Sequence, residues 1–406
     1  METFEYLLYQ LHLSYLQARK NKRNTHNQLA FELNQETNLH ALAKAIFERK
    51  YTPKPCIAFI INKPVMREIF AADFSDRVVH HLIYRCIYKD IDKRLIYDAY
   101  SCRERKGTLF GINRAKKMMR SCSENYTTKT YYLKLDIEAY FMNMEHDLLY
   151  KKAIAMLPPH KKSFLGISRK TLIYLIQQTI FNNVSSNCRI KGSRTDWKGL
   201  PPSKSLFNYP ANTGLPIGNL TSQVFGNVYL NDFDHYVKKE LKIKHYGRYV
   251  DDMLFFHNDK KYLEDIIPKL SHLLQADFKL NIHPNKIVLK AVEEGIPFLG
   301  QLIKPYRSYT GNRTKNNFYQ RIQQINKQMQ EVVHFSWKQL CDIRSTLNSY
   351  LGYMQHANSF QLRKIMMGRL IKRFYDFFFV QKDFKRVIIN KEFWEWHFLP
   401  SYQFIS

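Results

Sequence analysis

HYGRYVDDMLFF, residues 245–256, is the stretch that decides how this chain folds. Its two halves, His245–Tyr249 and Met253–Phe256, are rich in aromatic and apolar residues, which predicts two short strands around a tight turn at Val250-Asp251-Asp252. Asp favours turns in general, so an Asp-Asp pair in a hairpin can also be purely structural. The rest of the sequence has to show whether Asp251 and Asp252 only form a turn or also carry a chemical function.

A second acid ends a predicted strand upstream. Tyr131–Ile137 (YYLKLDI) is rich in β-forming residues and predicts a central strand that carries Asp136 at its end. Carboxylates with apolar flanks are costly to bury unless a cation lies between them. Mg²⁺ takes one or two carboxylates plus substrate phosphates, and two such ions roughly 3.5–4 Å apart clamp an in-line phosphoryl displacement.

We therefore expect Asp136 and Asp251 to be catalytic ligands of two Mg²⁺ ions, with Asp252 supporting them and Mn²⁺ as an alternative metal. An ordinary strand-end role for Asp136 stays open. The composition of the whole chain indicates what kind of partner would bind at such a site.

The charge of the chain is strongly positive. Its 406 residues include 63 Lys and Arg against 35 Asp and Glu, a formal net charge of +28, and 45% are hydrophobic. Such a chain can bury a large core in about two to three domains. The excess charge favours nucleic acid as partner over an acidic membrane or a merely basic surface.

Other classes of protein fit less well. The sequence has no uncharged apolar run near the ~18–20 residues of a spanning helix, and its N-terminus has no secretory pattern. Six Cys without a C-x-x-C pair indicate free thiols rather than disulfides or zinc. We expect a cytoplasmic protein with no membrane partner.

The two acidic motifs resemble those of reverse transcriptases, which pair an acid of D-I-x-x-[FY]-[FY] type with an aromatic-x-D-D hairpin. Further blocks resemble the family in the same order along residues 50–360. They are Arg67–Phe70, Asp73–His81, Asp98–Arg103, Lys106–Thr108, Phe298–Gly300 and Ser349–Gly352.

The resemblance implies an α+β fold, a right-hand polymerase with fingers and palm around an antiparallel sheet. It places a helical N-terminal extension at 1–50, fingers and palm at 51–304 and an α-helical thumb at 305–406. Helical periodicity agrees at 38–50, 75–95 and 219–240, and near 315–331, 336–351 and 359–376. A buried strand is expected at 56–61 and an irregular loop at 191–213.

The block Gly214–Gln223 (GLPIGNLTSQ) is similar to reverse transcriptases of diversity-generating retroelements. That resemblance implies mutagenic retrohoming: cDNA is made from a template-repeat RNA, with errors at template adenines, to diversify a target gene, and a small basic accessory protein takes part. Ile217 offers no hydrogen bond where related enzymes have an amide, which weakens discrimination. Gly218 lets the backbone approach the nascent pair. Ile217 could equally be a core residue at a helix entry.

The family assigns roles to other positions. For dNTP binding these are Arg67 at the triphosphate, Phe141 as the aromatic that excludes a 2′-hydroxyl, and the block residues Ile217, Gly218 and Gln223. Those for the primer are Tyr249, Phe298, Leu299 and Gly300. Lys286 is a candidate general acid or a plain surface lysine, Phe141 could be core, and Lys63 could assist Arg67 or lie in a solvated turn.

Two alternatives stay open. The chain could be another bacterial reverse transcriptase, of the phage-defence or abortive-infection type or of the group II intron type. It could also be a non-catalytic RNA-binding scaffold whose basic surface holds template RNA and primer.

Overall fold

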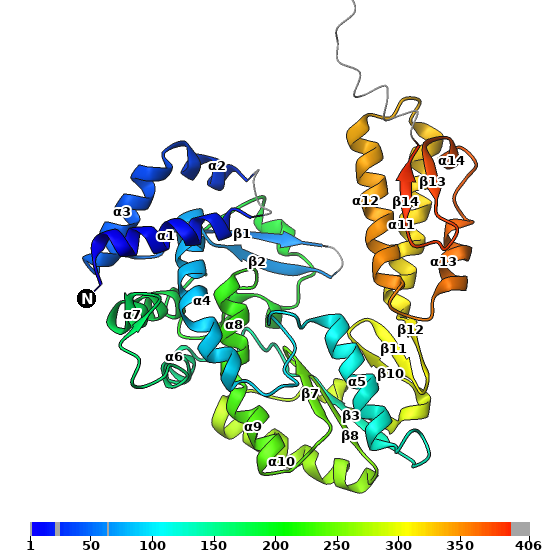
Figure 1. Ribbon diagram of the computed structural model, residues 1–406, viewed down its shortest axis with the longest axis horizontal. Helices are drawn as coiled ribbons and strands as arrows, with labels where there is room; N and C mark the ends of the chain where they lie inside the picture. Colours follow the sequence, from blue (N-terminus) through cyan, green and yellow to red (C-terminus); the bar gives the residue numbers. More distant parts are fainter. Residues whose placement is uncertain (1, 21–24, 63–64, 391–406) are drawn as a thin grey trace, which may run out of the picture. The chain divides into compact units, whose positions relative to one another are not determined.

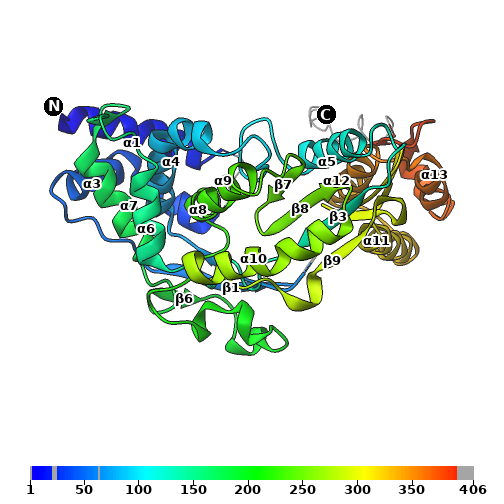
Figure 2. The same ribbon diagram turned by 90° about the horizontal axis from the view of Figure 1, so that it is seen from below.

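The computed structural model describes residues 2–20, 25–62 and 65–390 (Figures 1 and 2). The chain forms two compact units, one of residues 1–111 and 133–289, the other of residues 112–132 and 290–406. The boundaries at residues 50 and 304, which separate the N-terminal extension, the fingers and palm, and the thumb, stay predictions.

Helices make up the N-terminal part of the first unit. They are α1 (Phe4–Ala18), α2 (His26–Leu33), α3 (Gln35–Phe47) and α4 (Phe74–Arg94). The helix predicted at 75–95 is confirmed as α4, which begins where the Asp73 side chain accepts a hydrogen bond from the Ser75 N–H. The one predicted at 38–50 is present as α3, which begins and ends three residues earlier.

A three-stranded sheet follows, in the order β2-β1-β6. Strand β1 (Cys56–Ile61), predicted as a buried strand, lies in its middle, antiparallel to β2 (Arg67–Ala71) and parallel to β6 (Cys188–Ile190). The expected loop at 191–213 contains only three short 3-10 turns. The small core beside this sheet includes Ala58, Phe70 and Met142.

One helix prediction is wrong in its length. Residues 219–240 form two helices, α8 (Leu220–Tyr229) and α9 (Asn231–Lys239), because Leu230 has φ −98° and ψ 7°, outside the helical region. No Gly or Pro marks the break, so the sequence gives no local signal for it. Helix α8 is buried along almost its whole length, whereas α9 is amphipathic. The remaining elements here are α6 (His146–Ala155), β4 (Ser163–Phe164), β5 (Ile167–Ser168) and α7 (Arg169–Ile180).

The sheet that carries the acidic motifs has the order β7-β8-β3-β9. The predicted hairpin is confirmed as β7 (Tyr246–Tyr249) paired antiparallel with β8 (Asp252–His257), and the predicted central strand as β3 (Tyr131–Leu135). Helix α10 (Lys260–Phe278) leads from β8 toward β9 (Val288–Ala291), as Figure 2 shows. Asp136 therefore follows a strand next to the one that Asp252 begins.

The second unit combines a small antiparallel sheet with helices. Its elements are most of α5 (Thr108–Cys122), β10 (Ile296–Phe298), β11 (Gln301–Lys304), β12 (Arg307–Thr310), α11 (Asn312–Glu331), α12 (Trp337–Met354), α13 (Phe360–Met367) and α14 (Phe374–Phe377). The first two helices predicted after Pro305 are confirmed as α11 and α12.

The third predicted helix, 359–376, is wrong in its continuity. Helix α13 ends at Met367 and is followed by Gly368, a residue that commonly ends helices. Beyond α14 the chain forms a hairpin, β13 (Phe378–Val380) and β14 (Val387–Ile389), that the sequence pattern did not predict. Phe378, Val387 and Ile389 belong to the same buried cluster as residues of α11 and α12.

Two expectations about class can be compared with the described part of the chain. No helix in it has the length and apolar character needed to cross a membrane. All six cysteines lie in that part of the chain, and none of them is in a disulfide bond.

Candidate active site

Three aspartates come together at the ends of β3, β7 and β8. Asp251 lies in the two-residue turn between β7 and β8, and Asp252 begins β8. Burial raises the pKa of Asp251 to about 6, and the charges of Asp136 and Asp252 add to this shift. The shift means that negative charge at Asp251 is not fully compensated in the protein alone.

Two lysines compensate the other two acids. The Lys286 Nζ donates to Asp136 Oδ1 over 2.6 Å, and the Lys134 Nζ lies 3.0 Å from Asp252 Oδ1. The backbone holds Lys286 near, because the His283 N–H donates to the Asp136 carbonyl over 2.8 Å. Lys286, a candidate general acid, is thus in contact with a predicted catalytic acid, although it is half exposed.

Two of the three aspartates have the charge and surroundings that a divalent cation would favour. Among the described residues, no three His, Cys, Asp or Glu side chains form a ready-made metal cluster. Asp136 and Asp251 fit in charge, because a cation between them would relieve the repulsion that raises the pKa of Asp251. Mg²⁺ commonly takes only one or two carboxylates and completes its shell with phosphates and water. Asp136 would have to share or release Lys286 to bind such an ion, and Asp252 would have to release Lys134 to join it.

A buried ion pair beneath the turn was not foreseen. Arg248 and Asp234 have no exposed side-chain surface and form a bidentate pair, Nε to Oδ1 over 2.8 Å and Nη2 to Oδ2 over 2.6 Å. The Tyr246 hydroxyl donates to Asp234 Oδ1 as well. Burial alone would lower the pKa of Arg248, but the neighbouring Asp234 charge outweighs it and raises the pKa.

This pair also holds the backbone of the turn. The Arg248 Nη1 donates to the Val250 carbonyl over 2.8 Å. Val250 has φ 58°, a left-handed conformation that is a true outlier for a β-branched residue. Strain of this kind persists only where surrounding contacts impose it. The sequence signal that could have indicated this buried ion pair is the charged residue Arg248 inside an aromatic strand.

The predicted nucleotide residues are connected by backbone hydrogen bonds. The Leu215 N–H donates to the Phe141 carbonyl over 2.7 Å, and the Gly214 N–H donates to the Met144 carbonyl over 2.8 Å. The Phe141 ring packs against α8, where a Cβ on Gly226 would lie 3.3 Å from Phe141 Cε1. The block at 214–223 and the motif after β3 therefore form one structure.

Strand β2 joins the same structure. The Phe70 N–H donates to the Ile217 carbonyl and the Ala72 N–H to Asn219 Oδ1. Gly218 has φ 114°, and a Cβ there would lie 3.1 Å from Ile69 Cγ2, so a glycine is required. Arg67 is exposed at the start of this strand. Ile217 is partly buried and packs against the small core that contains Phe70.

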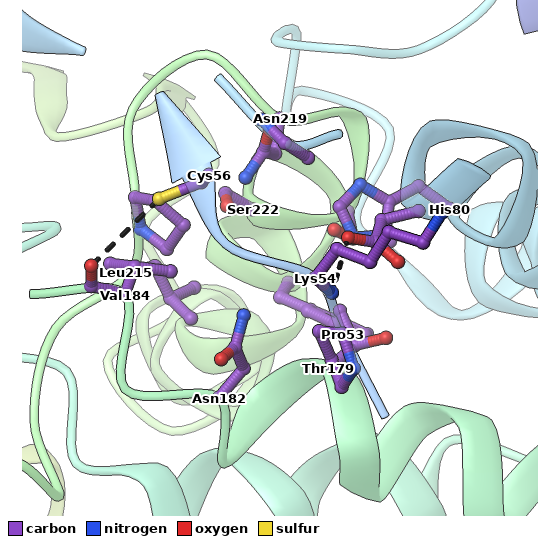
Figure 3. A pocket seen from close by; sticks show the side chains of 15 residues that line it. Pro53, Lys54, Cys56, His80, Thr179, Asn182, Val184, Leu215, Asn219 and Ser222 are labelled. Atoms are coloured by element: carbon purple, nitrogen blue, oxygen red, sulfur yellow. Dashed lines mark hydrogen bonds between the residues drawn. The ribbon is translucent and has the colours of Figure 1, made fainter. Parts of the chain in front are cut away.

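A cavity lies on the inner side of the same block (Figure 3). Leu215, Asn219 and Ser222 line it together with the buried His80. Its volume of about 20 Å³ is that of a single water molecule, far below the space that a nucleotide needs. Gly218 and Gln223 of the same block are exposed to solvent and do not line this cavity. The Cys102 thiol donates to Gln223 Oε1 over 3.1 Å.

The predicted primer residues lie in two places. Tyr249 ends β7, opposite Asp252, and is partly buried. Leu299 and Gly300 form the two-residue turn between β10 and β11 in the second unit, both with positive φ, and the Tyr353 hydroxyl donates to the Leu299 carbonyl. Phe298 is buried below that turn. Their role at a primer stays a prediction, and Lys63 lies outside the described residues.

Comparisons with solved structures find telomerases. Apo telomerase from Candida tropicalis, truncated from its C-terminal domain, is 14% identical over 68% of this chain and 60% of that chain, with a TM-score of 0.45. Telomerase from Candida albicans in complex with a fragment of telomeric RNA is 12% identical over 81% and 61%, with a TM-score of 0.47. This chain thus spans about three fifths of their length.

No curated protein matches the sequence. The family described as reverse transcriptase (RNA-dependent DNA polymerase) matches residues 66–303, more than half of the chain. The matched range contains the three aspartates, the nucleotide block and the hairpin at Leu299. The chain belongs to the reverse transcriptase family.

Proposed function

We propose that the protein copies RNA into DNA, using dNTPs and two Mg²⁺ ions. The observation that carries this proposal is the acidic site itself: Asp251 is held in a strained turn by a buried arginine, and Asp136 charge contributes to its raised pKa. Family membership supports the same reaction, and reverse transcriptases generally use divalent metal ions.

Each residue of the site has a separate proposed role in the reaction. Asp136 and Asp251 would hold the metal ions, which when bound neutralise charge on the transferred phosphoryl group and on the attacking and leaving oxygens. Arg67, exposed on β2, supplies a guanidinium for the triphosphate. Lys286, 2.6 Å from Asp136, holds a proton that the departing pyrophosphate could accept. Tyr249 and the turn at Leu299 would contact the primer.

Phe141 is proposed to select deoxyribonucleotides. Its ring is partly buried and packs against Gly226 of α8 and against the ring of Tyr140. Replacing Phe141 by Ala should therefore raise ribonucleotide incorporation relative to dNTP by about tenfold or more, because the contact that rejects the 2′-hydroxyl is lost. The measurement is the ratio of kcat/KM for each NTP and its dNTP.

The neighbouring Tyr140 offers a control for this change. Tyr140→Phe removes only the hydroxyl that donates to the Gly226 carbonyl, so it should leave sugar selectivity unchanged. A Phe141→Ala enzyme with the parent's selectivity would show that Phe141 is simply a core residue.

We further propose that the enzyme is of the diversity-generating type. It would copy a template-repeat RNA with errors at adenines, for mutagenic retrohoming into a target gene, together with a small basic accessory protein. The support is the apolar Ile217, whose carbonyl is bound to β2 beside the exposed Gly218. An apolar side chain at this place checks the base pair by shape alone.

Replacing Ile217 by Gln should lower misincorporation opposite template adenines several-fold, because an amide restores a hydrogen-bonding partner. The measurement is sequencing of cDNA made on a defined RNA. Ile217→Val, which keeps an apolar side chain, should keep the parent's errors. If the errors in the cDNA made by Ile217→Gln equal those of the parent, Ile217 is simply a core residue. Faithful copying of adenines by the parent would instead favour a phage-defence or intron-type reverse transcriptase.

A further inference from the structure

The second unit carries a basic pocket that the proposed reaction does not use. It has a volume of about 470 Å³ and is lined by residues of α5 and of the hairpin of β11 and β12. Figure 1 shows these elements. Lys116, Lys117 and Arg120 line it from α5, and Lys304 and Arg307 from the hairpin. No acidic side chain is among the described residues that line it, so its charge is strongly positive.

Two tyrosines complete the pocket. The rings of Tyr126 and Tyr306 lie 4.4 Å apart between centroids and are tilted by 59°. Tyr306 is 82% exposed, so most of its ring faces solvent although a large aromatic side chain gains from burial. A partner that covers this ring would gain that contact.

The backbone presents both rings at a cost. Tyr126 has φ 70° and Tyr306 has φ 64°, in the left-handed region where Gly or Asn is far more common than a bulky residue. Glu124 and Asn125 share this conformation, so three consecutive residues are left-handed at this turn. Such outliers gather where function requires a particular side chain. Here the side chain they present is an aromatic ring.

Exposed aromatic rings beside Lys and Arg match the chemistry of single-stranded nucleic acid. Bases stack on the rings while the cations contact the backbone phosphates. A duplex keeps its bases stacked inside, and an acidic peptide lacks a planar base to cover the ring. Burial lowers the pKa of Lys116, so a phosphate that compensates this partly desolvated charge is favoured there.

We propose that this pocket binds an unpaired nucleotide of the template RNA, with its base on Tyr306 and the adjoining phosphates on the cations of α5. The RNA source rests on the proposed function, since a reverse transcriptase must hold RNA beyond the copied base. The pocket would supply an RNA contact that is separate from the acidic site.

The test is binding of a fluorescently labelled, unstructured oligoribonucleotide to the full chain, measured by anisotropy without dNTPs. Tyr306→Ala should weaken binding about tenfold, because one base–aromatic stack is lost, and Tyr306→Trp should restore it. Lys117→Gln should weaken binding at low salt and reduce its salt dependence. Tyr9→Ala, which removes a 54% exposed tyrosine of α1, should bind as the parent does.

A fold control is built into the same position. Tyr306→Gly relieves the left-handed backbone, so its thermal midpoint should not fall below that of Tyr306→Ala, while its RNA binding should be equally weak. Weak binding that recovers in the Gly variant would mean that Tyr306→Ala acted through misfolding and would overturn the proposal.

Three other results would overturn it: unchanged affinity in Tyr306→Ala, an equal loss for a fully paired RNA hairpin, or a loss confined to DNA of the same sequence, which would assign the pocket to the cDNA. The outcome stays separate from the polymerase proposal. A chain that incorporates no dNTP can still show the Tyr306 effect, and an active polymerase can lack it.

Discussion

Replacing Asp251 by Asn is expected to reduce dNTP incorporation by at least about a thousandfold. Asn keeps the size of the side chain but removes the charge that a divalent cation requires between Asp251 and Asp136. Preorganised charge at the transferred group is commonly the largest single contribution to such a reaction. The measurement is single-nucleotide extension of an annealed primer on an RNA template, followed over time.

Two controls make this result specific. Asp265→Asn changes an exposed acid of α10 and should extend primers at the parent rate. The Asp251→Asn chain should bind template–primer with nearly the parent's affinity, since Lys and Arg contacts to phosphates dominate it. Extension that survives in Asp251→Asn would refute the metal assignment. A parent chain that binds RNA but extends no primer would be the non-catalytic scaffold.

The free energy of unfolding of Asp251→Asn provides a second, independent test of the site. The pKa of Asp251 is raised to about 6, so its ionised form is disfavoured in the folded chain. Folding stability should therefore rise as the pH falls from above 6 toward the unfolded value near 4. Asn removes this penalty, and without divalent metal at pH 8 the variant should be more stable by about 3 kcal/mol. Urea unfolding at pH 8 and pH 5 measures it, and an equal difference at both pH values would contradict the assignment.

The local parts of this site could be predicted from sequence. A strand that ends at Asp136 and a hairpin that turns at Asp251 follow from alternating aromatic and apolar residues with acids at the breaks. The connection between Phe141, Ile217 and β2 could not be predicted in this way. It consists of backbone hydrogen bonds between segments some 70 to 150 residues apart, and any residue can make these. Only the resemblance to a family indicated that they meet.

The errors have a similar origin. The break at Leu230 and the hairpin of β13 and β14 depend on tertiary packing that overrides local propensity. Gly218 was informative because its φ of 114° is one that other residues rarely adopt, whereas the predicted helix at 359–376 ran across Gly368, which follows the end of α13. Buried charge was the hardest feature to predict, because Arg248 and Asp234 look like surface residues until their separate segments meet.

That buried pair gives the second large expected effect. Asp234→Leu or Arg248→Met alone should destabilise the fold by about 3–5 kcal/mol, because each leaves an unpaired charge where no side-chain surface is exposed. The double variant, Arg248→Met with Asp234→Leu, should recover most of that loss, since an apolar pair of similar volume often replaces a buried ion pair without net cost. Urea unfolding of the three variants measures the coupling between the two residues.

The double variant then separates stability from positioning. It lacks the Arg248 hydrogen bond that holds the carbonyl of the left-handed residue Val250. A folded double variant should therefore extend primers about a hundredfold more slowly, with kcat reduced more than the KM for dNTP is raised, because a catalytic acid displaced by about 1 Å costs that much. A folded double variant with the parent's kcat would limit the pair to a structural role. A low kcat in a stable chain would instead show that the strain at Val250 is maintained so that Asp251 stays in position.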